Sequence, residues 1–339
     1  MRVLILHHKQ SEQAHSLAEE LAQSNVYTDI TDQLNPLRLL LNKYDLIHCL
    51  TNHNEIGLAH FLGVLTAKTL NIPTLLTVYS HFETELNTPY KLNYFDALTV
   101  PYISELKKTR WYNKPKMILP FLPLNYKHSP KWPNQHESFK SRSFVFPIVS
   151  SFDELKSVNF SLLRVTNTPT DLYVDARLMK KSLRSSSIRK TWQNFTTENP
   201  YFKSFTLFTE DKTFFNLFAT SQVYTFLHHL KIGGTLNTEW TLSALSSGNF
   251  LVLHEDQATA FSHFWKTEEN CFIFSSKVPT DFQYSSLNET LAKENFLNKE
   301  DFNTQFKQSI DLKINELIRL YTKIVSQKRS LSHNESQKV

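Results

Sequence analysis

Short apolar runs alternate with segments of helical periodicity in the first part of the chain. The runs have the continuous apolar character of strands buried on both faces, and they cover residues 2–6, 44–50, 74–78, 97–101 and 116–119. Apolar and small residues at helical spacing fill the intervals at residues 11–23, 56–70 and 104–111. Strands that alternate with helices in this way predict βαβ units and a parallel, doubly wound sheet.

The same alternation returns in the second half. Strands are predicted at residues 143–150, 171–174, 204–208, 222–227, 250–253 and 271–274. Helices are predicted at residues 212–221, 238–246 and 257–265, and a long amphipathic helix at residues 305–326. Between the halves, residues 120–142 carry Pro120, Pro123, Pro130 and Pro133 in a polar segment without periodicity, which indicates a linker.

These patterns predict an α/β protein of two Rossmann-like domains. In open α/β sheets ligands bind outside the carboxyl ends of the strands, so two such halves would face an interdomain cleft. The expected boundaries are a first domain at residues 1–125, a linker at 126–142, a second domain at 143–304, a final helix at 305–326 and a polar, disordered tail at 327–339.

The amino-acid composition argues against some kinds of binding site and bears on the compartment of the protein. The 339 residues include 26 Phe and 13 Tyr but only 5 Gly, which argues against an extended glycine-rich phosphate loop. Cys49 and Cys271 each stand in an apolar run without metal-ligand spacing, so both are expected to be buried free thiols in a reducing compartment. We find no signal peptide and no apolar stretch of membrane-spanning length, and expect a cytoplasmic protein, or one peripheral at the inner face of a membrane.

The order of segments resembles family 4 glycosyltransferases (glycosyl transferases group 1), which have the GT-B fold. The resemblance covers nearly the whole chain and is carried by four stretches: residues 45–78 with Asn71-Ile72-Pro73, residues 95–107, residues 218–252 with Leu242-Ser243-Ala244-Leu245, and residues 269–321. It implies an acceptor-side first domain, a nucleotide-sugar-side second domain and a final helix that crosses back to the first domain. It also implies a nucleotide-sugar substrate without a metal or other cofactor.

The donor-binding motifs of that family are substituted in this chain. Where the family has an Arg and, after four intervening residues, a Lys for the donor diphosphate, Ser151 and Lys156 stand here. Thr235 and Ser243 occupy the positions of the paired glutamates. Glu239, one helical turn before Ser243, could supply a carboxylate from a displaced position. The alternative for Lys156 is an ordinary surface lysine, and the alternative for Glu239 is a solvated charge on a helix, a common state for such residues.

The first half offers one polar group and one basic segment. The family histidine after the third strand corresponds to Tyr79, and His81 follows as the preferred catalytic candidate, with an exposed loop histidine as the alternative. A second group combines cations with an aromatic ring and suits an anionic lipid headgroup or an acceptor sugar: Lys107, Lys108, Arg110 and Trp111, followed by Lys114 and Lys116. Its alternative is the solvated end of a helix.

Two functions remain open from the sequence. The first is a glycosyltransferase of hexosyltransferase type, transferring a sugar from a nucleotide sugar to a saccharide, lipid-linked or protein acceptor in polysaccharide or glycoconjugate biosynthesis. The second is a non-catalytic pseudo-glycosyltransferase that acts as a binding or complex-forming subunit, which the substitutions at Ser151, Thr235 and Ser243 favour. A nucleic-acid partner is not expected from either interpretation.

Overall fold

The chain divides into two compact units, residues 1–124, 259–261 and 305–339 in the first and residues 125–258 and 262–304 in the second. The computed structural model describes residues 1–8, 11–33, 36–51, 58–79, 92–101, 103–120, 122, 143–148, 170–175, 180, 186, 189–190, 193–194, 197, 202–208, 223–226, 250–254, 271–274 and 299–336. The two units are described separately below.

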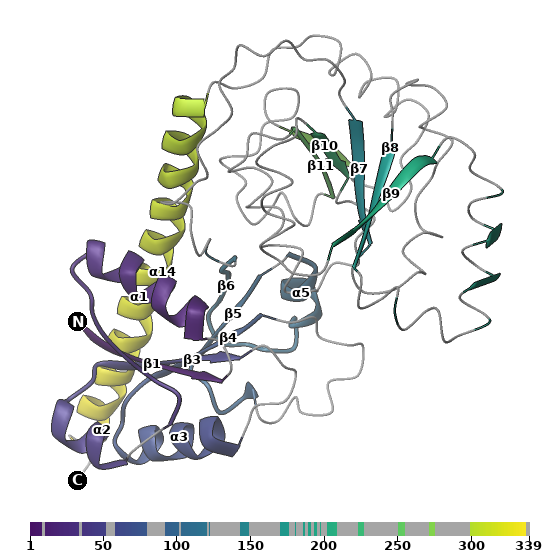
Figure 1. Cartoon of the computed structure of the whole chain (residues 1–339). Helices are drawn as coiled ribbons and strands as arrows, with labels where there is room; N and C mark the ends of the chain where they lie inside the picture. Colours follow the sequence, from purple (N-terminus) through teal and green to yellow (C-terminus); the bar gives the residue numbers. More distant parts are fainter. Residues whose placement is uncertain are drawn as a thin grey trace. The chain divides into compact units, whose positions relative to one another are not determined.

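The first unit is built on a six-stranded parallel sheet with the order β2-β1-β3-β4-β5-β6. Its strands are β1 (Arg2–His8), β2 (Tyr27–Thr31), β3 (Leu46–Thr51), β4 (Thr74–Val78), β5 (Ala97–Val100) and β6 (Lys116–Ile118). Its helices are α1 (Ser11–Gln23), α2 (Pro36–Asn42), α3 (Leu58–Thr69), α5 (Ile103–Lys108) and the part of α14 (Lys299–Ser336) that follows residue 304 (Figure 1). The predicted parallel α/β architecture is therefore confirmed.

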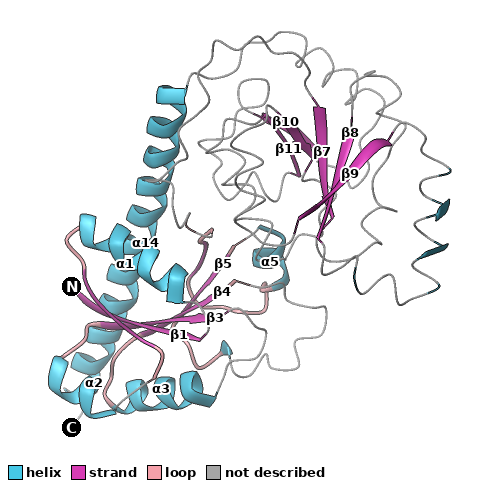
Figure 2. Cartoon of the chain, in the orientation of Figure 1, coloured by secondary structure: helices cyan, strands magenta, loops and turns pink. Residues whose placement is uncertain are grey.

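Helices cover both faces of this sheet. Side chains alternate between the faces along each strand, so a continuous apolar strand has apolar side chains to bury on both faces. On one face, Ile47 and Leu76 join a buried cluster with Leu39 of α2 and Val64 of α3, and Leu106 of α5 packs against it. On the other face lie α1 and α14; α1 and α3 stand on opposite sides of the strands (Figure 2). Every residue of β3, β4 and β5 is buried, as their continuous apolar sequences predict.

Helix α14 is longer than the sequence predicts. It runs from Lys299 to Ser336, beyond both ends of the expected helix at residues 305–326 and through most of the tail expected to be disordered. No glycine or proline interrupts this stretch. The Arg329 guanidinium also forms an ion pair of 2.7 Å with Asp45, the residue before β3, so the extended part of the helix contacts the first unit. Apolar side chains at helical spacing bury its inner face: Ile310, Ile314, Leu317, Tyr321 and Ile324.

The second unit contains a six-stranded parallel sheet with the order β12-β11-β10-β7-β8-β9. Its strands are β7 (Ser143–Ile148), β8 (Thr170–Asp175), β9 (Phe202–Phe208), β10 (Val223–Phe226), β11 (Phe250–His254) and β12 (Cys271–Phe274), and each coincides closely with a predicted strand. The helices predicted at residues 212–221, 238–246 and 257–265 lie outside the described residues.

Candidate functional site

Each sheet has a topological switch point, where the strands that follow in the sequence are added on one side of the first strand and then on the other. In the first sheet this point lies between β1 and β3, which are paired through His8 and Thr51 at their carboxyl ends. In the second sheet it lies between β7 and β10, which are paired through Val145 and Thr225. The carboxyl edge at such a switch point is where open α/β sheets bind ligands. These two edges are therefore the candidate functional sites of the two units.

The predicted donor residues adjoin the second switch point in the sequence. Ser151 and Lys156 follow β7, whose last residue is Ile148. The positions Thr235, Glu239 and Ser243 lie between β10 and β11. All five, together with His81 of the first unit, lie outside the described residues, and their roles stay predictions.

Near the first switch point, Tyr79 continues the pairing of β4 with β3. Its backbone N–H donates to the carbonyl oxygen of Thr51 over 2.9 Å, one residue beyond the end of β4. The Tyr79 side chain is 1% exposed, and burial raises the pKa of its hydroxyl. The sequence resemblance aligns Tyr79 with a histidine of family 4 glycosyltransferases, but a buried, protonated phenol does not act as a base at neutral pH. Tyr79 therefore offers no basic group at neutral pH.

A row of buried polar side chains crosses the α14 face of the first sheet. His48 of β3 lies with its Nδ1 atom 2.6 Å from the Tyr321 hydroxyl of α14 and its Nε2 atom 2.5 Å from Thr77 Oγ1 of β4. Thr77 Oγ1 is in turn hydrogen-bonded to Thr99 Oγ1 of β5. All four side chains are completely buried. The row therefore joins three strands and the final helix through side-chain hydrogen bonds.

Burial keeps this row neutral. It lowers the pKa of His48 to about 3, so the imidazole is uncharged at neutral pH. It also raises the pKa of Tyr321, and the neighbouring Tyr79 raises it further. Because His48 is completely buried, it has no access to a substrate, and its role is to fix α14 on the sheet. The sequence interpretation treated His48 only as part of a strand; a histidine inside an otherwise apolar run was the signal for a buried partner.

The chain leaving β6 is held at the first turn of α1. The Gln13 amide nitrogen donates to the Leu122 carbonyl oxygen, and the Leu122 N–H donates to Gln13 Oε1, both over 3.0 Å. Gln13 is 2% exposed and Leu122 is 1% exposed. Two parallel hydrogen bonds from one amide fix both the position and the direction of the chain at Leu122.

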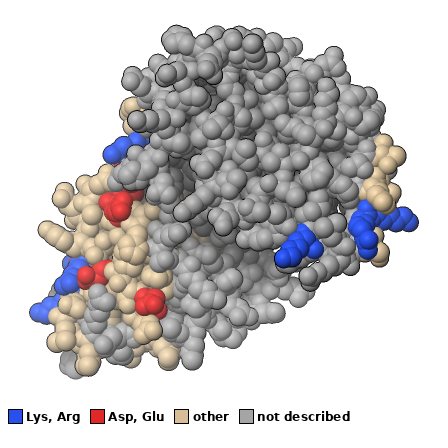
Figure 3. Space-filling model, viewed as in Figure 1, with Lys and Arg blue, Asp and Glu red and all other residues tan. Residues whose placement is uncertain are grey.

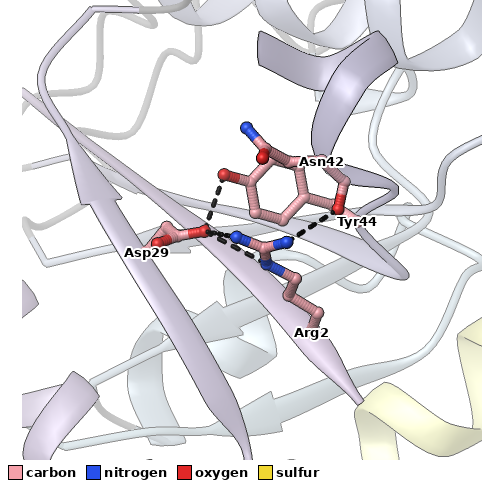
Figure 4. Close-up of polar contacts among 4 residues, drawn as sticks. All are labelled: Arg2, Asp29, Asn42 and Tyr44. Carbon is pink, nitrogen blue, oxygen red and sulfur yellow. Dashed lines mark hydrogen bonds and ion pairs between the residues drawn. The ribbon is translucent and has the colours of Figure 1, made fainter.

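A second polar cluster joins the amino ends of the strands. Arg2 donates from Nη2 and Nε to one carboxylate oxygen of Asp29, over 2.8 and 3.2 Å, and the Tyr44 hydroxyl donates to the same oxygen over 2.7 Å (Figure 4). The guanidinium also donates to the Asn42 carbonyl oxygen and lies over the Tyr44 ring. These contacts link β1, β2 and the segment before β3 at the edge opposite the switch point, so we assign them a structural role.

The structure divides the predicted basic segment into two groups. Lys107, Lys108, Arg110 and Trp111 are exposed. Two further lysines donate instead to backbone carbonyl oxygens of their own unit: Lys114 to Asn93 and Phe95, and Lys116 to Thr109 and Tyr112. The prediction of a contact surface is therefore limited to the first four residues. In Figure 3, cations and anions are mixed on the left of the view, whereas the charged groups drawn on the right are cations.

Both cysteines are buried free thiols, as predicted. Burial raises the pKa of Cys49 to about 12 and that of Cys271 further, which leaves both as inert thiols at neutral pH. Among the described residues, no group of three or more His, Cys, Asp or Glu side chains could hold a metal ion. Within the same ranges, no helix has the length and apolar character to cross a membrane.

No protein-family model matches the chain, and no curated protein matches it. Solved structures do match. The glycosyltransferase from Rickettsia africae ESF-5 superposes with a TM-score of 0.59 at 10% identity, over 96% of this chain and 98% of that one. HepE from Anabaena in complex with UDP gives a TM-score of 0.49 at 12% identity, over 99% and 100% of the two chains. MurG from Acinetobacter baumannii gives 0.44 at 10% identity, over 95% and 99%. Identity this low shows the fold alone: the chain has the fold of the Rickettsia africae glycosyltransferase.

Proposed function

We propose that this protein is a glycosyltransferase that transfers a sugar from a nucleotide-sugar donor to a saccharide, lipid-linked or protein acceptor. The observation that carries the proposal is the fold, which matches a glycosyltransferase over 96% of the chain. Two parallel sheets, each with a switch point at its carboxyl edge, supply the kind of site in which such folds bind their ligands. The finer proposal is a family 4-like enzyme with an acceptor-side domain at residues 1–125 and a donor-side domain at residues 143–304.

The donor is proposed to bind beyond the carboxyl end of β7. Ser151 and Lys156 follow this strand, and Thr235 and Ser243 follow its neighbour β10. Lys156 brings a positive charge to the donor diphosphate, and charge-assisted hydrogen bonds are about twice as strong as neutral ones. The hydroxyls of Ser151, Thr235 and Ser243 contribute neutral hydrogen bonds where the family has charged groups. Donor binding is therefore proposed to depend strongly on one lysine.

The proposed catalytic groups are His81 and Glu239. His81 brings a titratable ring that Tyr79, a buried phenol, cannot replace. Glu239 is the carboxylate nearest in sequence to the two positions that lack theirs. Neither group requires a metal ion in this scheme. This scheme predicts slow turnover, because the neutral hydroxyls of Thr235 and Ser243 offer less binding energy to the transition state than a pair of glutamates does.

The last part of the proposal concerns where in the cell the protein meets its acceptor. A cytoplasmic protein would meet soluble or protein acceptors, whereas contact with the inner face of a membrane would bring it to lipid-linked ones. Lys107, Lys108, Arg110 and Trp111 are exposed and combine cations with an indole ring, as a headgroup contact requires. We propose that these four residues contact anionic headgroups or the acceptor.

Binding calorimetry with nucleoside diphosphates tests the donor site. Lys156→Ala should weaken the tightest-binding nucleotide by roughly 10- to 150-fold, the equivalent of the ~1.5–3 kcal/mol typical of a hydrogen bond to a charged group. Lys180→Ala is the matched control, since it removes an exposed lysine from the same unit. Equal affinities in the two variants would refute the role of Lys156. Failure of the native protein to bind any nucleotide would instead favour a non-catalytic binding subunit.

A further inference from the structure

Helix α2 is apolar on the side that faces solvent. Leu37, Leu40 and Leu41 follow the i, i+3, i+4 spacing of one helical stripe and are 65%, 56% and 79% exposed. Leu39, on the opposite side, is 2% exposed and belongs to the buried cluster of the sheet. A surface helix normally places polar residues on its outer side. The exposed leucines of α2 are therefore not explained by packing in the core of their own unit.

Helix α3 continues this apolar exterior. Leu62 and Leu65, one turn apart, are 52% and 36% exposed, while Val64 and Ala67 point into the buried cluster. Helices α2 and α3 contact each other and lie on the same side of the sheet (Figure 2). Their outer leucines belong to neighbouring helices of one layer, and we call this set the leucine surface: Leu37, Leu40, Leu41, Leu62 and Leu65.

The charges in these two helices have one sign. Arg38 in α2, Lys43 directly after it and Lys68 in the last turn of α3 are cations, and neither helix contains Asp or Glu. Lys43 and Lys68 are exposed, and the Lys68 ammonium lies 4.7 Å from the centre of the Tyr94 ring. The nearest carboxylates along the chain are Asp32 before α2, Glu55 before α3, and Asp45 after α2, which accepts hydrogen bonds from Arg2 and Arg329. Glu55 lies outside the described residues.

We propose that the leucine surface docks on an anionic lipid surface, with its leucines at the level of the acyl chains and its flanking cations among the headgroups. Exposed apolar patches of contiguous residues mark interaction sites. Short helices with apolar residues on one side and Lys or Arg beside them suit the membrane interface, where both groups are satisfied at once. A protein partner fits less well, because the residues that dominate protein interfaces are Trp, Tyr and Arg, and leucine is under-represented among them.

The leucine surface is distinct from the basic segment of residues 107–111, but both belong to the same helical layer. Leu106 of α5 packs against the same buried cluster as Leu39 of α2 and Val64 of α3. The basic segment supplies charge and one indole ring, whereas α2 and α3 supply apolar side chains. The inference does not depend on the donor site, and a failure to bind nucleotides would leave it standing.

Vesicle co-sedimentation of the full chain tests the inference. The vesicles contain equal parts phosphatidylcholine and phosphatidylglycerol, with phosphatidylcholine alone as the neutral arm. Leu40→Gln/Leu41→Gln and Leu62→Gln/Leu65→Gln should each lower the partition coefficient on anionic vesicles about tenfold or more, since burial of a single leucine contributes at least that factor. Glutamine is a good helix former, so α2 and α3 should persist. Leu312→Gln is the matched control, because Leu312 is 46% exposed on α14, away from this surface. It should change the coefficient less than twofold.

Several results would overturn the inference. The native chain could fail to bind anionic vesicles, or both double variants could bind them as tightly as the control does. Equal binding to neutral and anionic vesicles would reject the role of the flanking cations. Sedimentation velocity tests the alternative that a second copy of the chain covers the leucine surface. A native dimer that Leu40→Gln/Leu41→Gln converts to a monomer would show this and overturn the inference. Two variants on different helices protect the test from misfolding of either one, which circular dichroism would reveal.

Discussion

Tyr321→Phe is the sharpest perturbation of the link between α14 and the first sheet. The change removes one oxygen atom, which lies 2.6 Å from Nδ1 of His48. It keeps the aromatic ring, which packs edge-on against the imidazole with 5.7 Å between ring centroids. Because His48 is completely buried, water cannot replace the lost partner.

An unsatisfied buried polar atom costs about 1–3 kcal/mol. Hydrogen exchange at the amides of β3 measures this cost locally, which matters because a two-unit chain need not unfold in one step. Protection of the β3 amides should fall by roughly 5- to 150-fold in Tyr321→Phe, since ~1.4 kcal/mol corresponds to tenfold. The amides of the second sheet should keep their protection.

Tyr27→Phe is the matched control. It makes the same chemical change at a tyrosine of β2 that is 74% exposed, where solvent satisfies the hydroxyl in both states. The effect there should stay within about 0.5 kcal/mol. Unchanged β3 protection in Tyr321→Phe, or an equal loss in the two variants, would refute the assignment of the His48–Tyr321 contact as a stabilising tie.

Two further predictions concern the first unit. Burial holds the pKa of His48 at about 3 against an ordinary value of 6.5, so the unfolded state binds the proton first as the pH falls. The contribution of His48 to stability is complete above about pH 6.5 and declines toward pH 3 by ~1.4 kcal/mol per pH unit. His48→Asn should remove this slope from the pH dependence of β3 exchange, and an unchanged slope would contradict the burial argument. Gln13→Ala should expose the Leu122 amide and raise its exchange rate by roughly 5- to 150-fold. Equal exchange in Gln13→Ala and native protein would contradict the contact.

The central strands could be predicted because burial on both faces leaves a continuous apolar run. β4 coincides with its predicted range, and β3 lies within one or two residues of its own. The edge strand β2 (Tyr27–Thr31) was missed, because its residues are only partly buried and Asp29 interrupts any apolar run. Helix α2 was also missed, since it has leucines on two sides and therefore no amphipathic period.

The polar row of the first sheet could not be predicted from local patterns. His48 and Tyr321 are separated by 273 positions, and no spacing rule connects two residues so far apart. The sequence also treated Lys114 and Lys116 as members of a cationic surface, although both donate to carbonyl oxygens within their own unit. Local charge patterns do not reveal such acceptors, because these depend on how the chain folds back on itself.

The release of nucleoside diphosphate from a panel of nucleotide sugars tests the central claim most directly. The full chain is incubated with each nucleotide sugar, without and with saccharide and lipid-linked acceptors, and the released diphosphate is quantified. Transfer predicts that at least one donor is consumed, that the acceptor increases the rate, and that Lys156→Ala lowers the release at limiting donor by roughly 10- to 150-fold. No binding and no release across the whole panel would contradict the proposal that this fold serves a glycosyltransferase here.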